Sequence, residues 1–143
     1  GRGLKVELVD GDKLRELLPL TGYSKEDRDN HVRRAGILAS YLERNGVIVI
    51  ASLVSPYQES RDFVRGLCRN FVEIYVSTPL EACEKRDVKG LYARARRGEI
   101  KNFTGVSDPY EPPSHPEFAI DTSLMSIEDV LGRIMTIVER RIA

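Results

Sequence analysis

The sequence predicts an α/β domain of three layers, in which helices cover a parallel sheet. Strand-like apolar runs alternate with helical patterns along the whole chain. The run at residues 47–54 is apolar at consecutive positions, which is typical of a strand buried on both faces of a parallel sheet. At 143 residues the chain is long enough for one domain with its own core, and we expect one domain over residues 1–143.

The first expected strand leads to the candidate site. Residues 6–9 end at Asp10-Gly11-Asp12, which predicts a buried strand, a tight turn and a helix starting near Asp12 and continuing over residues 13–18. Ligands of α/β sheets bind at the carboxyl ends of the strands, so Asp10 and Asp12 would face a binding crevice. Alternatively, Asp12 is only an N-cap and Asp10 merely supports the turn. Pro19 and the Thr21-Gly22 pair predict a break after this helix.

A long helix is expected over residues 25–44. Ser24 is its predicted N-cap, Asp27 stands at the capping-box position, and Asn45-Gly46 would end it. Its expected core face consists of Val32, Ala35, Leu38, Ala39 and Leu42.

The later strands are followed by further helix starts. After residues 47–54, Ser55 is a predicted N-cap, Pro56 suits the first helical position and Gln58 completes a capping box. Residues 72–77 and 118–121 are the third and fourth expected strands, and Ser126 would cap a final helix. The stripe of that helix expected to pack on the sheet is Ile127, Val130, Leu131, Ile134, Ile137 and Val138.

Between these last strands lies a basic segment. Residues 86–105 are rich in Lys and Arg and have glycines near each end, which indicates a partly helical lid. With the irregular, proline-rich residues 108–116, this lid would extend over about residues 86–116. Arg94, Arg96 and Arg97 fit a solvated helix face as well as they fit a ligand-binding role in this lid.

Composition narrows the function classes. Lys plus Arg and Asp plus Glu both number 22, so no global field favours nucleic acid or membrane, and an anion site must be local. No apolar run reaches the roughly 20 residues of a membrane span. Cys68 and Cys83 are isolated thiols without metal-ligand spacing, so we expect a cytoplasmic protein.

Five blocks closely resemble the adenylylsulfate kinase family, in the same order and over nearly the whole chain. They are LVDGD at residues 8–12, YSKEDR at 23–28, VSPY at 54–57, RDVKGLY at 86–92 and IKNFTG at 100–105. The resemblance implies a P-loop kinase-like fold. It also implies transfer of the ATP γ-phosphoryl group to the 3′-hydroxyl of adenosine 5′-phosphosulfate in sulfate assimilation, with Mg²⁺ bridging the phosphates.

The resemblance also implies roles for individual residues. Asp10 would orient or deprotonate the 3′-hydroxyl, and Asp12 would help hold the substrate and, through water, the metal. Arg28 and His31 occupy the family's Arg-x-x-Asn pair, and the imidazole could make binding pH-dependent. Ser55 stands at a position once assigned as a phospho-enzyme intermediate, but its predicted N-cap role explains its identity better.

Further contacts follow from the same resemblance. Arg15 would bind the phosphosulfate, and Phe103, with Tyr23 opposite, would stack on the substrate adenine. Lys89 and Lys101 would close over the anionic ligands, and Arg86 would lie along the adenine of ATP. The remaining implied substrate contacts are Gly11, Lys13, Val54 and Asn102.

One element of the family pattern is missing. The 143 residues contain no Gly-x-x-x-x-Gly-Lys-Ser/Thr loop, which cradles the phosphates of ATP. We expect that a P-loop segment precedes these residues in the parent protein and that its strand and helix are absent from the sheet. The alternatives are an inactive kinase-like module that binds adenylylsulfate or its 3′-phosphorylated product, and a kinase for another nucleoside-like acceptor. A homodimer and a fused or separate ATP sulfurylase stay open as partners.

Overall fold

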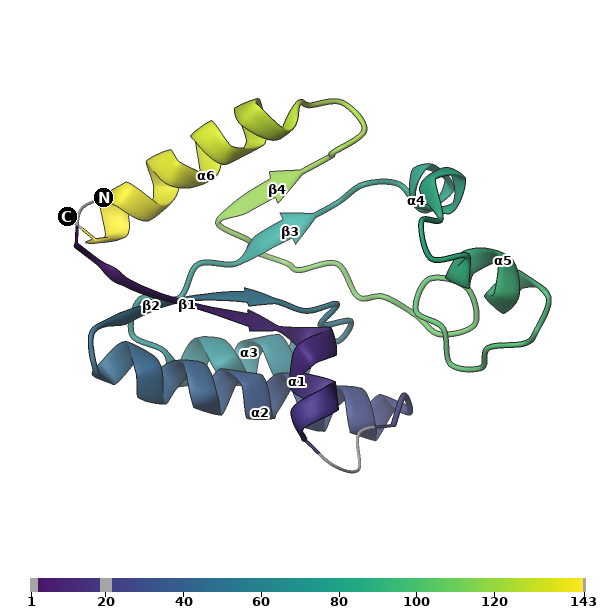
Figure 1. Ribbon diagram of the computed structural model, residues 1–143, viewed down its shortest axis with the longest axis horizontal. Helices are drawn as coiled ribbons and strands as arrows, with labels where there is room; N and C mark the ends of the chain where they lie inside the picture. The colour runs from purple at the N-terminus through teal and green to yellow at the C-terminus, as the bar shows by residue number, and fades with distance from the viewer. Residues whose placement is uncertain (1–2, 19–21, 143) are drawn as a thin grey trace. The chain divides into compact units, whose positions relative to one another are not determined.

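The computed structural model describes residues 3–18 and 22–142, so Pro19 and Thr21 lie outside the described residues. The chain divides into two compact units, Gly1–Phe71 and Val72–Ala143, and each is described by itself. The first unit contains β1 (Lys5–Asp10), α1 (Gly11–Leu17), α2 (Lys25–Arg44), β2 (Val47–Ser52) and α3 (Gln58–Leu67). The second contains β3 (Ile74–Val76), α4 (Leu80–Arg86), α5 (Leu91–Arg96), β4 (Phe118–Ile120) and α6 (Ile127–Ile142) (Figure 1).

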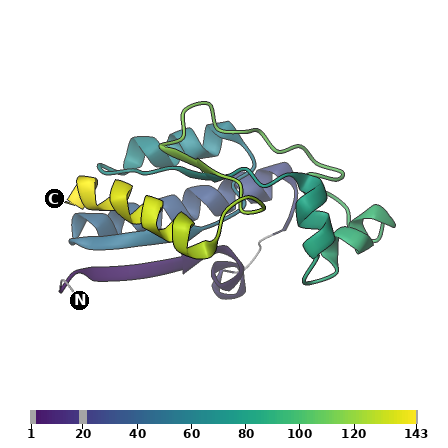
Figure 2. The same cartoon turned by 90° about the horizontal axis from the view of Figure 1, so that it is seen from above.

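The first unit is built on a parallel pair of strands. β1 pairs with β2 in a register that runs from Lys5 opposite Val47 to Asp10 opposite Ser52. Parallel strands need a long crossover, which α1 and α2 supply, and α2 and α3 lie on the same side of the pair (Figure 1). Both strands therefore end at one edge of the sheet, where β1 runs directly into α1 (Figure 2).

These strands are more exposed than predicted. Val9 is the buried residue of β1, whereas Val6 and Leu8 are 55% and 58% exposed, and Ile50 of β2 is exposed as well. In the described sheet each strand has a single partner, and α2 and α3 lie on only one side of the pair. The prediction that residues 47–54 are buried on both faces is therefore wrong, and in the strand predicted to be buried at residues 6–9 only Val9 is buried.

Helix α2 begins and ends as predicted. Ser24 Oγ accepts from the Asp27 amide at 3.1 Å, and Asp27 Oδ2 accepts from the Ser24 amide at 3.2 Å, which completes the capping box. After the helix, Gly46 has a φ of +74°, a conformation that favours glycine. The buried residues of α2 are His31, Val32, Ala35, Gly36 and Ser40.

The core face of α2 was predicted only in part. Val32 and Ala35 are buried as expected, but Leu38 is exposed. The buried stripe follows the small residues Gly36 and Ser40 instead, because Gly36 lies directly against Val64 of α3. Close approach of the two helices therefore decides which face is covered.

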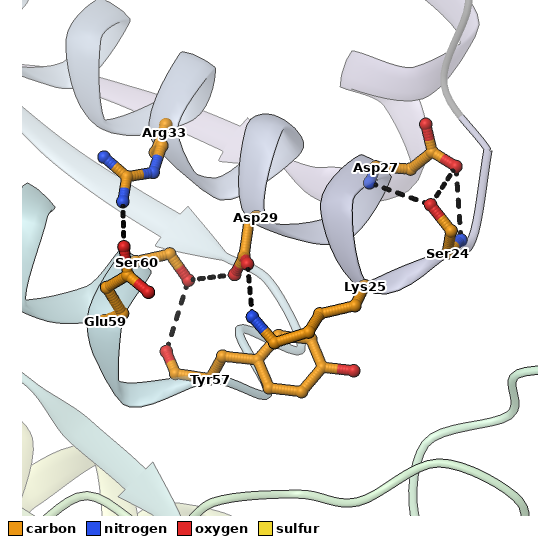
Figure 3. Close-up of polar contacts among 8 residues, drawn as sticks. All are labelled: Ser24, Lys25, Asp27, Asp29, Arg33, Tyr57, Glu59 and Ser60. Carbon is orange, nitrogen blue, oxygen red and sulfur yellow. Dashed lines mark hydrogen bonds and ion pairs between the residues drawn. The ribbon is translucent and has the colours of Figure 1, made fainter.

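Polar groups join α2 to α3 beside this contact (Figure 3). The fully buried Ser60 donates from Oγ to Asp29 Oδ1 at 3.0 Å, and Asp29 Oδ2 accepts from Lys25 Nζ at 3.0 Å. The Lys25 ammonium also lies 4.7 Å from the ring centroid of Tyr57. At the next turn, Arg33 pairs with Glu59 at 3.0 Å. Tyr57 is buried, so its side chain packs in the core.

The second unit is built on a shorter parallel pair, in which Ile74 of β3 lies opposite Phe118 of β4. The N-cap of α5 is Gly90, and Asp87 binds the first turn of this helix, since its Oδ1 and Oδ2 accept from the amides of Tyr92 and Ala93, both at 3.0 Å. These amides hold the pKa of Asp87 below its ordinary value. Residues 109–116 contain no helix or strand, as their prolines predict.

Helix α6 begins at the predicted cap, where Ser126 Oγ accepts from the Asp129 amide at 3.1 Å. The prediction that its apolar stripe packs on a sheet is wrong for Ile127 and Leu131, which are exposed. The other four residues of the stripe are half-buried. Across residues 3–18 and 22–142, no helix has both the length and the apolar composition of a membrane span.

The Gly36 contact predicts opposite effects for two glycine-to-alanine substitutions. A Cβ at Gly36 would lie 2.4 Å from Cγ2 of Val64, whose β-branched side chain is stiff, so Gly36→Ala should lower the free energy of unfolding by about 1–3 kcal/mol. Gly132→Ala in α6 meets no atom within 4 Å and should be neutral or stabilising by up to about 1 kcal/mol. Urea unfolding of both variants checks this, and equal effects would contradict it.

Candidate functional site

The site begins at the junction of β1 and α1. Asp10 Oδ1 accepts from the amides of Asp12 and Lys13, both at 3.0 Å, so Asp10 is the N-cap of α1. The predicted alternative, that Asp12 is the cap, is wrong, and α1 starts at Gly11 without an intervening turn. Both cap bonds use Oδ1, which leaves Oδ2 outside the cap.

Gly11 fits tightly against the end of β2. A Cβ at this position would lie 3.1 Å from the Ser52 carbonyl oxygen and 3.4 Å from Cγ of Leu53. Glycine therefore lets the first turn of α1 pack against β2, which holds Asp10 and Asp12 at the edge where both strands end.

His31 of α2 is tied to this same turn. Its side chain is buried, with the residue 4% exposed, and Nε2 lies 3.1 Å from the Gly11 carbonyl oxygen. A carbonyl only accepts, so Nε2 carries the proton, and Nδ1 is buried with no hydrogen-bond partner among the described residues. Burial, together with the charges of Arg15 and Arg34, lowers the pKa of His31 against the opposing effects of the Gly11 bond and Asp12.

Two guanidinium groups gather on the ring of Tyr23. The Cζ atoms of Arg15 and Arg28 lie 4.6 Å and 5.5 Å from its centroid. Arg15 donates to the Gly22 carbonyl at 2.7 Å, and Arg28 Nε donates to the Tyr23 carbonyl at 3.1 Å. In a chain without net charge, this pair forms a local positive site.

The loop after β2 completes the site in an unexpected conformation. Ser55 has a φ of +44°, and the N-cap of α3 is Tyr57, which makes no side-chain cap bond. The prediction of Ser55 as N-cap is therefore wrong. The Ser55 carbonyl instead accepts from Nη1 of Arg61 at 2.5 Å.

These residues line a half-open cavity of about 370 Å³ in the first unit. Its lining consists of Asp10, Gly11, Asp12, Arg15, Tyr23, Arg28, His31, Val32, Ser52, Leu53, Val54, Ser55 and Pro56. Nine of the predicted site residues are in this lining; Lys13, which contributes its amide to the cap, is not. Val32, Ser52, Leu53 and Pro56 were not predicted, because apolar and small residues next to a motif carry no signal of their own.

The other predicted contacts belong to the second unit. Arg86 donates to Oγ1 and the carbonyl oxygen of Thr122, at 2.8 and 2.9 Å. Lys89 and Lys101 lie in the segments before and after α5, and Asn102 has a φ of +55°. The Phe103 ring meets Tyr92 edge-to-face, with centroids 5.2 Å apart.

Arginines at the end of α5 and just after it pair with glutamates at the surface. Arg96 pairs with Glu84, and Arg94 and Arg97 pair with Glu99 at 3.4 and 2.6 Å. The three arginine side chains are more than half exposed, which agrees with a solvated helix face. Among the residues that the structure describes, no group of three or more His, Cys, Asp or Glu side chains could hold a metal.

Solved structures define the class of protein. Over 96% of its length, the chain aligns with 82% of the Mycobacterium tuberculosis APS kinase, whose structure contains AMPPNP and APS, at a TM-score of 0.90 and 36% identity. It also aligns over 97% of its length with 23% of the hexameric APS kinase chain from Thiobacillus denitrificans, at a TM-score of 0.69 and 32% identity. The fold is that of the P-loop kinases.

Sequence comparison is more specific. The family model for adenylylsulphate kinase matches residues 1–121. The adenylyl-sulfate kinase of Rippkaea orientalis is 53% identical over 133 residues, which make up 92% of this chain and 74% of that protein. The chain belongs to the adenylylsulphate kinase family, as its five sequence blocks predict.

The lowered pKa of His31 predicts an acid-sensitive contribution to stability. Below the ordinary histidine pKa of 6.5, the unfolded chain binds a proton more readily than the folded protein does. The free energy of unfolding therefore decreases as the pH is lowered through this range. His31→Gln keeps a donor that reaches the Gly11 carbonyl and removes the titration. The free energy of unfolding of the wild type, relative to this variant, should therefore decrease from about pH 7 to pH 5.

Urea unfolding across this range measures the effect. His115→Gln, at the other histidine, is the matched control for the substitution itself. A constant difference between wild type and His31→Gln from pH 5 to pH 8 would contradict a lowered pKa.

Proposed function

We propose that the cavity of the first unit binds adenosine 5′-phosphosulfate, to whose 3′-hydroxyl this kinase transfers the γ-phosphoryl group of ATP. One observation carries the proposal: two carboxylates, Asp10 and Asp12, line the same cavity as the arginine pair on Tyr23. A group that accepts a hydroxyl proton and groups that bind an anion are what this reaction requires. The cavity volume of about 370 Å³ is within the range of small-ligand sites.

Asp10 is proposed to orient the 3′-hydroxyl and accept its proton. Its Oδ1 is held by two backbone amides, so the carboxylate is fixed before the substrate arrives. Oδ2 can then accept from the hydroxyl as the phosphoryl group is transferred. Positioning of this kind is the main contribution a protein makes to phosphoryl transfer.

Asp12 is proposed to hold the substrate and, through a water, Mg²⁺. Its carboxylate lies in the lining of the cavity, and carboxylate oxygens fit a hard cation that usually keeps several waters. When bound with ATP, Mg²⁺ supplies charge neutralisation at the phosphates.

The phosphosulfate is proposed to lie against Arg15 and Arg28, whose planar guanidiniums suit its oxygens. The Tyr23 ring already contacts both guanidinium groups, so the predicted stacking on adenine would have to use this same ring. Neutral His31 would line the substrate site without adding positive charge. Gly11, Val54 and Ser55 line the pocket, and Lys13 would contribute from the surface of α1. We do not favour Ser55 as a phosphorylated intermediate, since its backbone conformation indicates a structural role.

We propose the remaining contacts on the family resemblance alone. Phe103 would stack on the substrate adenine, while Lys89, Lys101 and Asn102 close over the ligands. Arg86, held by Thr122, would lie along the adenine of ATP. A cytoplasmic location, a homodimer and a fused or separate ATP sulfurylase belong to the same proposal, and the hexameric relative supports self-association but not the number of subunits.

Asp10→Asn is the variant that separates catalysis from folding. Asparagine keeps an oxygen for the two amides of the cap and loses the charge, so adenylylsulfate affinity should be kept while turnover falls by about 100-fold or more. Calorimetric titration measures the affinity. A coupled assay measures turnover in a chain in which a P-loop segment precedes residue 1.

Asp10→Ala is the matched comparison, because it also removes the cap and should lower the free energy of unfolding by about 1 kcal/mol. Wild-type turnover by Asp10→Asn would remove Asp10 from this role. Absence of adenylylsulfate binding by the wild-type chain would overturn the proposed substrate.

Phe103→Ala tests the stacking role. The loss of one base-stacking face should weaken adenylylsulfate binding by about 1–3 kcal/mol, and Phe103→Tyr should retain most of the affinity. Because Phe103 also contacts Tyr92, Tyr92→Leu controls for disturbance of the segment itself. Equal affinities for wild type and Phe103→Ala, measured by calorimetry, would show that the segment does not use this ring.

A further inference from the structure

Ser55 holds a backbone conformation that its sequence disfavours. Its φ of +44° lies in the left-handed region, where a residue with a Cβ is strained. The next residue is Pro56, whose ring pushes the preceding residue toward extended conformations. Pro56 itself is fully buried, which fixes the far side of this peptide. Another interaction must therefore hold Ser55 against relaxation to a negative φ.

The guanidinium of Arg61 is placed to supply that interaction. Arg61 is 6% exposed, and its Nη1 donates to the Ser55 carbonyl at 2.5 Å. Nη2 donates to Oε1 of Gln58 at 2.9 Å, and Gln58 donates to Asp62 at 2.7 Å. The planar fork is thus anchored on α3 by one nitrogen and holds the carbonyl with the other. A charged donor in a buried setting makes a stronger hydrogen bond than a neutral one.

The held segment forms one wall of the cavity. Val54, Ser55 and Pro56 all line it, whereas Arg61 is not among the lining residues. If the Ser55 backbone rotated to a negative φ, the peptide between Val54 and Ser55 would turn relative to the anchored carbonyl and change this wall.

We propose that Arg61 is a positioning residue, which keeps Ser55 in its left-handed conformation and thereby shapes the adenylylsulfate cavity. The inference rests on the proposed function for the identity of the ligand, and on the structure alone for the link between Arg61 and Ser55. A lysine in place of Arg61 offers no planar fork, so Arg61→Lys should keep the charge and lose part of the positioning.

A double-mutant cycle between positions 61 and 55 tests this link. Glycine adopts a positive φ without strain, so the Ser55→Gly background no longer needs the guanidinium to hold the backbone. Arg61→Met should weaken adenylylsulfate binding about tenfold in the wild-type background, and less than about threefold in the Ser55→Gly background. Arg65→Met is the matched control, because Arg65 lies one turn further along α3, over Phe71, and its loss should leave the affinity unchanged.

Crystal structures of the ligand-free variants give a readout that needs no substrate. Ser55 should leave the left-handed region in Arg61→Met, whereas position 55 should keep a positive φ in the double variant Ser55→Gly/Arg61→Met. An unchanged φ at Ser55 in Arg61→Met, or an equal loss of affinity in both backgrounds, would overturn the proposal. If the wild type failed to bind adenylylsulfate, the proposed function would fail, while the φ of Ser55 in Arg61→Met would still decide the role of Arg61.

Discussion

The parallel pairing of β1 with β2 is the constraint on which the site depends. The register ends with Asp10 opposite Ser52, so two segments more than forty positions apart in the sequence finish at the same edge. One then turns into α1 and the other into the loop that contains Ser55. The cavity is lined by residues at or just after these two strand ends, by Arg15 of α1, by Tyr23 before α2, and by Arg28, His31 and Val32 of α2.

Charge is distributed at this edge in a way that the overall composition does not reveal. The chain has equal numbers of acidic and basic residues, yet two guanidiniums lie on the ring of Tyr23, just before the start of α2. The carboxylates beside them are fixed by backbone amides or lie in the cavity wall. His31 is kept neutral by burial, so it links α2 to Gly11 without adding to the positive charge. Anion binding and proton acceptance can therefore coexist in a small volume.

Local signals in the sequence were sufficient for much of the fold. The capping box of α2 was predictable because Ser24 and Asp27 interact with each other only three residues apart. Asp10 and Asp12 were predicted at the strand end, but not which of them caps the helix, since that depends on the direction in which β1 enters α1. The cap predicted at Ser55 was wrong because Arg61, six residues later, holds its carbonyl. Strand burial was overestimated because it depends on how many neighbours pair with a strand, which no local pattern encodes.

The N-cap at Asp10 couples the folding of the first turn of α1 to the orientation of a carboxylate in the site. Oδ1, which caps the N-terminus of α1, and Oδ2, which is available to a substrate, belong to the same carboxylate. Fraying of the first helical turn would therefore also release the carboxylate from its fixed orientation. A ligand bound to that carboxylate would thus be coupled to helix formation. Its presence would be registered as slower hydrogen exchange at the amides of Asp12 and Lys13, even if it touched neither of them.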